Sequence, residues 1–106
     1  MSYATAAEIR VYCPSIDTQR SDAELTAYAE NEETLTINPL LLKQYSAQEI
    51  AGSDIAVSLS AKLGALAALK NVYGNNANSA MDVDLKELQE DVNSTLKRLR
   101  TGEIRL

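Results

Sequence analysis

The stretch that decides the fold is Ile55–Tyr73, which reads IAVSLSAKLGALAALKNVY. Its apolar side chains spread over more than one face of a helix with 3.6 residues per turn. A helix that is apolar nearly all round belongs in the middle of a bundle, where neighbours contact it from several sides. The pattern therefore predicts a central core helix. Small residues that would let neighbouring backbones approach it closely are Ala61, Gly64, Ala65, Ala67 and Ala68.

This stretch is long enough to resemble a membrane span, but its polar residues argue against one. Lys62 lies near its centre, and Lys70 and Asn71 lie close to its end. A lysine near the centre of a membrane helix costs about 3 kcal/mol to insert. The N-terminus also lacks the charged-then-apolar pattern of a signal peptide. We therefore expect no membrane contact and synthesis in the cytoplasm.

The N-terminal part of the chain predicts two helices that begin with capping boxes. Thr5–Glu8 is the first such box and opens a short helix that Pro14 ends. The inward side chains of this helix are predicted to be Ala6, Ile9 and Cys13.

Ser21–Glu24 is the second capping box, and its helix is predicted to run to about Thr36. We expect Asn38-Pro39 to break that helix, because proline lacks the backbone N–H that helices require. Its apolar face is predicted to be Leu25, Tyr28, Ala29 and Leu35. Its solvated acidic face is predicted to be Glu30, Glu32 and Glu33.

Short elements and loops are predicted around the central helix. Leu40–Tyr45 has the composition of one helical turn, and Ser46–Glu49 is a third possible cap that Gly52 ends. The composition of Gly74–Ser79 indicates a loop.

The last helix is amphipathic, with Asp82 or Asp84 as its predicted cap. Gly102 is predicted to stop it, and Glu103–Leu106 then forms a short extended tail. Its apolar stripe is Leu85, Leu88, Val92, Leu96 and Leu99. The sequence thus predicts an all-α bundle of four helices with a connecting turn and no strand.

The length of the chain indicates how many domains it forms, and its composition excludes several kinds of site. A chain of 106 residues forms one domain, residues 1–106, with a modest core. It has no histidine and one cysteine, which excludes intrachain disulfides, Cys/His zinc sites and Ser–His–Asp or Cys–His catalysis. The formal net charge of −5 disfavours DNA binding, because non-specific affinity for DNA depends on cations that neutralise phosphates.

Three groups of side chains could carry chemistry, and we favour a structural interpretation of each. The acidic cluster on the second helix has no further ligand at fixed spacing, so we interpret it as a solvated face. Cys13 has no histidine to activate it and is interpreted as a small buried residue. Lys97, Arg98 and Arg100 stand where cations complement a helix dipole, with phosphate contact as the alternative. We predict no enzyme and no catalytic, metal-binding or cofactor-binding residue.

Taken in order, these segments are similar to a family of small tailed-phage proteins. The chain resembles head-to-tail adaptor or head-completion proteins of the Mu-type, with Thr101–Leu106 as the most specific part. Leu35–Gly52 departs from the family, whose members usually carry there a single proline-containing loop without the inserted SAQEIAG. The segments that carry the resemblance are SYATAAEIRVY (2–12), SDAELTAYAENEETL (21–35), LKNVYG (69–74) and LKRLRTGEIRL (96–106).

The resemblance implies an all-α subunit of a virion ring. About twelve copies would form a closed ring under the portal protein, which extends the DNA channel and docks a tail, stopper or terminator protein. Packaged DNA would pass through without sequence-specific binding. The protein would be assembled in the host cytoplasm and reside in the neck of the virion. A cytoplasmic, antitoxin-like regulatory module that forms a monomer or dimer is the alternative.

The C-terminal tail is the candidate docking element, because it is apolar at alternate positions and too short to pack alone. In this interpretation it lies in a groove or at a sheet edge of a neighbouring protein. The alternative is that it folds back between the first and last helices. The candidate docking residues are Gly102, Glu103, Ile104, Arg105, Leu106, Lys97, Arg98 and Arg100.

Overall fold

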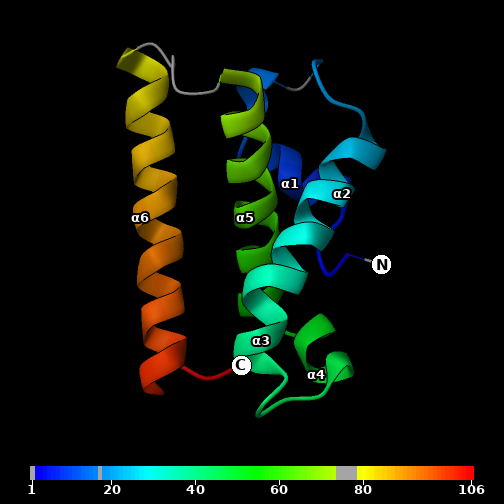
Figure 1. Cartoon of the computed structure of the whole chain (residues 1–106), viewed down its shortest axis with the longest axis vertical. Coiled ribbons are helices and arrows are strands. Elements are labelled where there is room, and N and C mark those ends of the chain that lie inside the picture. The colour runs from blue at the N-terminus through cyan, green and yellow to red at the C-terminus, as the bar shows by residue number, and fades with distance from the viewer. Residues whose placement is uncertain (1, 17, 74–78) are drawn as a thin grey trace.

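The computed structural model describes residues 2–16, 18–73 and 79–106, and every regular element in them is helical (Figure 1). This confirms the all-α prediction. Within these ranges the helices number five rather than the predicted four when the uninterrupted run from α2 through η2 to α3 is counted as one, because α4 forms an independent helix. The elements are α1 (Ala6–Val11), the 3₁₀ turn η1 (Pro14–Ile16), α2 (Asp22–Glu32), the π-helical turn η2 (Glu33–Ile37), α3 (Asn38–Leu41), α4 (Ala47–Ala51), α5 (Asp54–Tyr73) and α6 (Ser79–Thr101).

Three helices begin with the predicted capping boxes. The hydroxyls of Thr5, Ser21 and Ser46 accept the backbone N–H three residues later, at α1, α2 and α4 respectively. In each box the glutamate at that third position accepts the backbone N–H of the cap in return. These bonds satisfy N–H groups that a helix start otherwise leaves unpaired, so each start is set by four consecutive residues.

Pro39 does not break the second helix as predicted. Instead, α2, η2 and α3 follow one another without interruption, and Pro39 lies in the first turn of α3, where its missing N–H costs little. The wider π turn before it uses a bond five residues back, in which Asn38 N–H donates to the Glu33 carbonyl. Proline disrupts the backbone hydrogen bonds that join each residue of an α-helix to the fourth residue before it. The wider π turn accommodates this disruption, so the chain continues in the same direction through Pro39.

The central helix is confirmed as α5, against which α1, α2, α4 and α6 all pack (Figure 1). Gly64 makes the closest approach: a Cβ at that position would lie 3.0 Å from Ala29 Cβ and 3.2 Å from Ala29 Cα on α2. The predicted small residues Ala61, Ala65 and Ala68 are buried in the same cluster. By length and composition alone α5 is also the one helix in the described part of the chain that could cross a membrane, a test that buried core helices pass.

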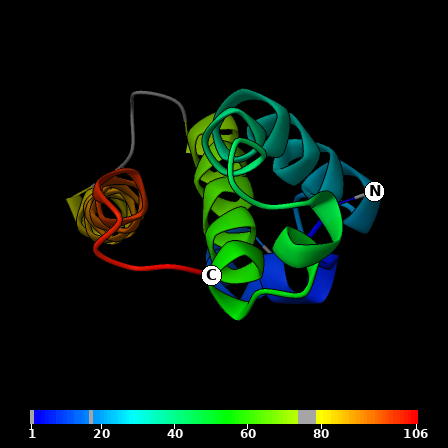
Figure 2. The same cartoon turned by 90° about the horizontal axis from the view of Figure 1, so that it is seen from below.

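The last helix stands on one side of α5, apart from the other helices (Figure 2). Its apolar stripe is confirmed, since Val92, Leu96 and Leu99 are buried. Two polar contacts add to this packing: Lys62 Nζ on α5 lies 2.6 Å from Asp91 Oδ2 on α6, and Lys70 Nζ donates to Gln89 Oε1 at 2.9 Å. Because its other side faces solvent, α6 forms a separate outer face of the bundle.

Two details of the last helix differ from the prediction. The helix begins at Ser79, so Asp82 and Asp84 lie within it and do not cap it. Met81 lies four residues before Leu85 and continues the apolar spacing toward the N-terminus, so the sequence carried a signal for the earlier start that the prediction did not use. The predicted loop 74–79 otherwise lies outside the described residues.

Candidate docking site

The last helix ends in a hydrogen-bonded turn that fixes the direction of the tail. Gly102 has φ of +76°, which is the left-handed conformation favoured by glycine, as its predicted role as a stop requires. Gly102 N–H donates to the Leu99 carbonyl at 3.4 Å, and Glu103 N–H donates to the Arg98 carbonyl at 2.9 Å. These two bonds form a Schellman motif, which turns the chain away from the helix axis.

After this turn the tail folds back onto its own bundle. Ile104 and Leu106 are partly buried and pack against the core cluster around Leu59, Leu96 and Leu99. Figure 2 shows the tail running from the end of α6 to the beginning of α5. This position matches the fold-back alternative, although the tail meets α5 rather than the first helix. Docking of the tail into a neighbouring protein stays a prediction.

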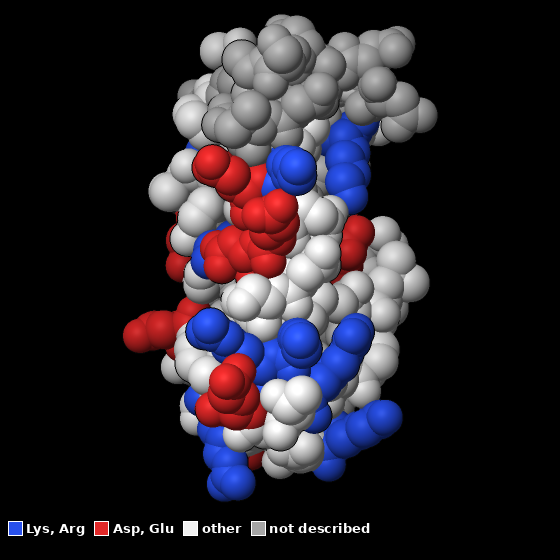
Figure 3. Space-filling model, turned by 90° about the vertical axis from the view of Figure 1, so that its left-hand side faces the viewer, with Lys and Arg blue, Asp and Glu red and all other residues white. Residues whose placement is uncertain are grey.

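The exposed face of α6 is mainly acidic in its N-terminal half and basic near its C-terminal end (Figure 3), with Lys86 as an exposed cation among the acidic side chains. Exposed Glu87 and Glu90 lie on its N-terminal half, whereas exposed Lys97 and Arg100 lie on its C-terminal half. Arg98 and Arg100 lie in the last turn of α6, where cations complement the helix dipole, and this role for them stays a prediction. Within the described residues, however, neither Lys97 nor Arg100 contacts a carboxylate, so both remain available to a partner.

Arg98 differs from its neighbours because it has an acidic partner in the tail. Arg98 Nε lies 3.4 Å from Glu103 Oε2, and more than half of each side chain is exposed. Exposed ion pairs of this kind contribute between 0 and about 1 kcal/mol to stability. The pair therefore neutralises Arg98 and Glu103 locally, and it leaves Lys97, Arg100 and Arg105 as the cations of the candidate site.

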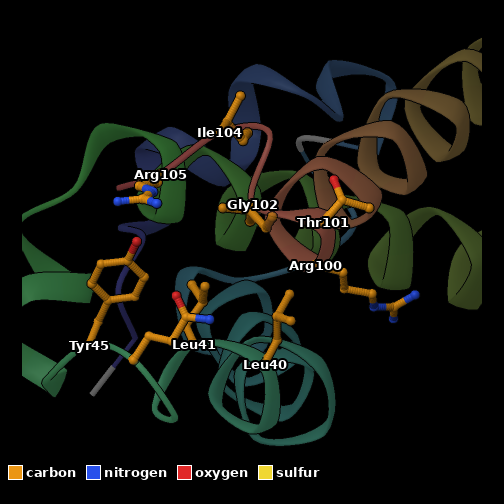
Figure 4. Close-up of a pocket in the computed structure, with 10 residues that line it drawn as sticks. Leu40, Leu41, Tyr45, Arg100, Thr101, Gly102, Ile104 and Arg105 are labelled. Carbon is orange, nitrogen blue, oxygen red and sulfur yellow. The ribbon is translucent and has the colours of Figure 1, made fainter.

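A cavity of about 220 Å³ lies between α3, the loop before α4 and the C-terminal turn (Figure 4). We call it the tail cavity. Figure 4 shows the Arg105 guanidinium and the Tyr45 hydroxyl pointing toward one another, while Arg100 extends away from them. None of the described lining residues is acidic. The lining residues are Leu40, Leu41, Gln44, Tyr45, Leu99, Arg100, Thr101, Gly102, Ile104 and Arg105.

The structure brings together only part of the predicted acidic face. Glu30 is exposed and Glu32 is half-buried, but Glu33 is 4% exposed and points into the bundle. Its Oε2 accepts hydrogen bonds from Tyr3 N–H at 2.7 Å and from the hydroxyls of Ser2 (3.0 Å) and Ser60. The prediction of a solvated Glu33 is therefore wrong, and its carboxylate instead ties the N-terminal segment to α2 and α5.

The Glu33 carboxylate also affects Tyr3, whose hydroxyl donates to Asn38 Oδ1 at 2.7 Å. Burial, and secondly the negative charge of Glu33, raise the pKa of the Tyr3 phenol above its usual value of 10.0. Both effects disfavour a second negative charge at this place. The sequence analysis did not predict this network. Its one signal was spacing, since Glu33 lies four residues after Ala29 and four before Ile37, both of which are buried.

The other candidate groups have structural positions. Cys13 is 1% exposed and its Sγ donates to the Ile9 carbonyl at 3.3 Å, which confirms its interpretation as a small buried residue. In the parts of the chain that the structure describes, no three acidic or cysteine side chains converge as metal ligands would. No family model, curated protein or solved structure matches this chain.

Proposed function

We propose that this chain is a structural virion protein of a tailed phage, namely a head-to-tail adaptor. In this proposal its copies form a ring of about twelve below the portal protein, extend the DNA channel and dock a tail, stopper or terminator protein. The protein acts without cofactor or catalysis, is assembled in the host cytoplasm and resides in the neck of the virion.

The observation that carries the proposal is that the bundle has two different sides. α6 occupies one side of α5, whereas α1 and α2 occupy the other (Figure 2). A ring requires a heterologous interface, in which one patch of each subunit meets a different patch of the next. A bundle with a separate amphipathic helix on one side and a helix pair on the other offers two such patches.

Exposed apolar side chains are further support, because they provide contact area for neighbours. Val11 at the end of α1 is 69% exposed, and Leu35 in η2 is 65% exposed. Leu42, just after α3, is 49% exposed. Leu35 had been predicted to face inward. Burial of a leucine or valine contributes about 1.5–3 kcal/mol, so contacts at these positions would stabilise a small protomer.

The charge of the chain is compatible with a channel through which DNA moves. The net charge is −5, and Glu30 on α2 and Glu87 and Glu90 on α6 are exposed. Acidic surfaces repel phosphate, so a lumen lined by them would let DNA pass without adhering. This supports DNA as a passing molecule and disfavours it as a bound ligand.

Deletion of the gene from the phage that encodes this protein tests the proposal. The expected result is heads that package DNA but carry no tails, together with free tails in the same lysate. Addition of the purified protein to such a lysate should restore infectious particles. Normal virions from the deletion phage would contradict the proposal, and a change in gene expression without a structural defect would favour the regulatory alternative.

A further inference from the structure

We propose that the tail cavity binds a carboxylate side chain from an acidic segment of a partner protein. The inference rests on the proposed function only in taking that partner to be a component of the virion. The partner must present a carboxylate, and the C-terminal tail forms one wall of the cavity that binds it.

The donors of the cavity fit a carboxylate. The guanidinium of Arg105 carries five N–H donors in a planar fork, and the phenol of Tyr45 supplies an O–H donor opposite it (Figure 4). Among the described residues, no acidic side chain lines the cavity and Arg105 has no carboxylate partner. A carboxylate placed between these two groups would accept charge-assisted hydrogen bonds from Arg105 and a further one from Tyr45.

The size of the cavity fits one side chain. Its 220 Å³ exceeds the roughly 150 Å³ that holds a benzene molecule, and lies below the roughly 300 Å³ at which pockets for larger ligands begin. Leu40, Leu41 and Leu99 lie along its inner wall, where they would contact the methylene groups of a glutamate or aspartate. The cavity is therefore suited to a single acidic residue inserted from a chain that lies across its mouth.

The surroundings of the cavity favour a protein segment with several acidic residues. Exposed Lys97 and Arg100 on α6 and exposed Lys43 after α3 have no acidic partner in the described residues. These cations would attract further carboxylates of the same segment and accelerate its association.

Nucleic acid fits the site less well. The acidic half of α6, with Glu87 and Glu90, continues the same face and would repel a phosphate backbone that extends beyond the cations. A backbone is held by a groove that follows it, whereas the tail cavity accepts one group. The observations thus favour an acidic peptide over DNA or RNA.

Peptide display with the full-length protein tests the inference. A library of random 12-residue peptides is selected on the wild-type protein and counter-selected on the Arg105→Glu variant. Selected peptides are then synthesised with a fluorescent label, and their binding is measured by anisotropy. The matched control is Lys86→Glu, which reverses an exposed cation on α6 away from the cavity.

We expect the selected peptides to be rich in Asp and Glu. Arg105→Glu should weaken their binding about tenfold or more, because it removes charge-assisted bonds and adds repulsion. Tyr45→Phe should weaken it about tenfold, the size of one hydrogen bond to a charged acceptor. Lys86→Glu should leave binding within about twofold. Circular dichroism should give equal melting temperatures for wild type and Arg105→Glu, because Arg105 is exposed.

Three results would overturn the inference: no selected peptide, selected peptides without acidic residues, or equal losses in Arg105→Glu and Lys86→Glu. Tighter binding of a labelled DNA duplex than of the peptides would also overturn it. The selection uses the isolated protein, so its outcome is independent of ring assembly. A protein that binds acidic peptides yet is dispensable for head-to-tail joining would refute the proposed function and leave this inference standing.

Discussion

The crossing of α2 and α5 at Gly64 gives the most quantitative prediction. A Cβ at position 64 would meet three atoms of Ala29, namely Cβ at 3.0 Å, Cα at 3.2 Å and N at 3.3 Å. Two of these are backbone atoms, which have no rotamer that moves them away. Any side chain at position 64 therefore forces the two helices apart by a few tenths of an ångström or more.

The expected change in the free energy of unfolding is the difference between two opposing effects. Replacing a helical glycine by alanine or leucine gains up to about 1 kcal/mol of helix propensity. Overpacking of a close core contact costs about 1–3 kcal/mol, and more when the added group is large. We expect Gly64→Ala to lower the free energy of unfolding by about 1 kcal/mol and Gly64→Leu by about 1–3 kcal/mol. In a chain of this size, each kcal/mol lowers the melting temperature by about 4 °C.

Thermal unfolding followed by circular dichroism measures both variants. The control is Ala67→Leu on the same helix, where a cavity of about 230 Å³ borders the side chain and the effect should stay within about 0.5 kcal/mol. The double variant Ala29→Gly/Gly64→Ala moves the methyl group from α2 to α5. Its loss of unfolding free energy should be about 1 kcal/mol smaller than the sum of the losses in the two single variants. An unchanged melting temperature in Gly64→Leu would refute the close packing of these helices.

Three further predictions concern the anchored ends of the chain. Glu33→Gln should destabilise the protein by about 1.5–3 kcal/mol in urea unfolding, because the carboxylate accepts three hydrogen bonds, whereas Glu30→Gln should change stability by less than about 0.5 kcal/mol. Removal of 103–106 should cost about 2 kcal/mol, since half-buried Ile104 and Leu106 leave the core, and an unchanged melting temperature would instead support a tail that docks only in another protein. Because the pKa of Tyr3 is higher in the folded state, its protonated phenol stabilises the fold below pH 10, and this contribution is lost as the pH rises through the pKa of the folded state. Melting temperatures measured over a pH series should therefore decline at alkaline pH, and Tyr3→Phe should make this decline smaller.

The sequence was sufficient to predict those features of the structure that depend only on residues close together in the chain. The capping boxes at Thr5, Ser21 and Ser46 and the glycine stop at Gly102 were predictable, because each motif satisfies backbone groups within four or five residues. The central position of α5 was predictable for a different reason, since a helix that is apolar on all sides requires neighbours on all sides.

The second helix shows where such reasoning fails. Its buried residues recur every fourth position, at Leu25, Ala29, Glu33, Ile37 and Leu41. An α-helix with 3.6 residues per turn would rotate such a series away from the core, and the π turn over 33–37 restores its direction. The same turn exposes the predicted core residue Leu35 and buries Glu33, which the periodic pattern placed in solvent.

The tail cavity was beyond prediction from sequence for another reason. It joins Tyr45 to Arg105, two residues far apart in the chain that meet only after the tail folds back onto α5. The sequence did identify Gly102 and the alternating Ile104 and Leu106 as features of the tail. It held no signal for which face of the bundle they would contact, because that face is built from segments that lie far from the tail in the chain.

Electron microscopy of this protein with the portal protein from the same genome tests the central claim most directly. Negative-stain images are recorded of the portal alone, of this protein alone and of the mixture. The adaptor proposal predicts an added ring on one end of the portal, with the rotational symmetry of the portal and a monomer or weak oligomer for the isolated protein. Bare portals in the mixture, together with a tight two-fold dimer of the isolated protein at micromolar concentration, would contradict it.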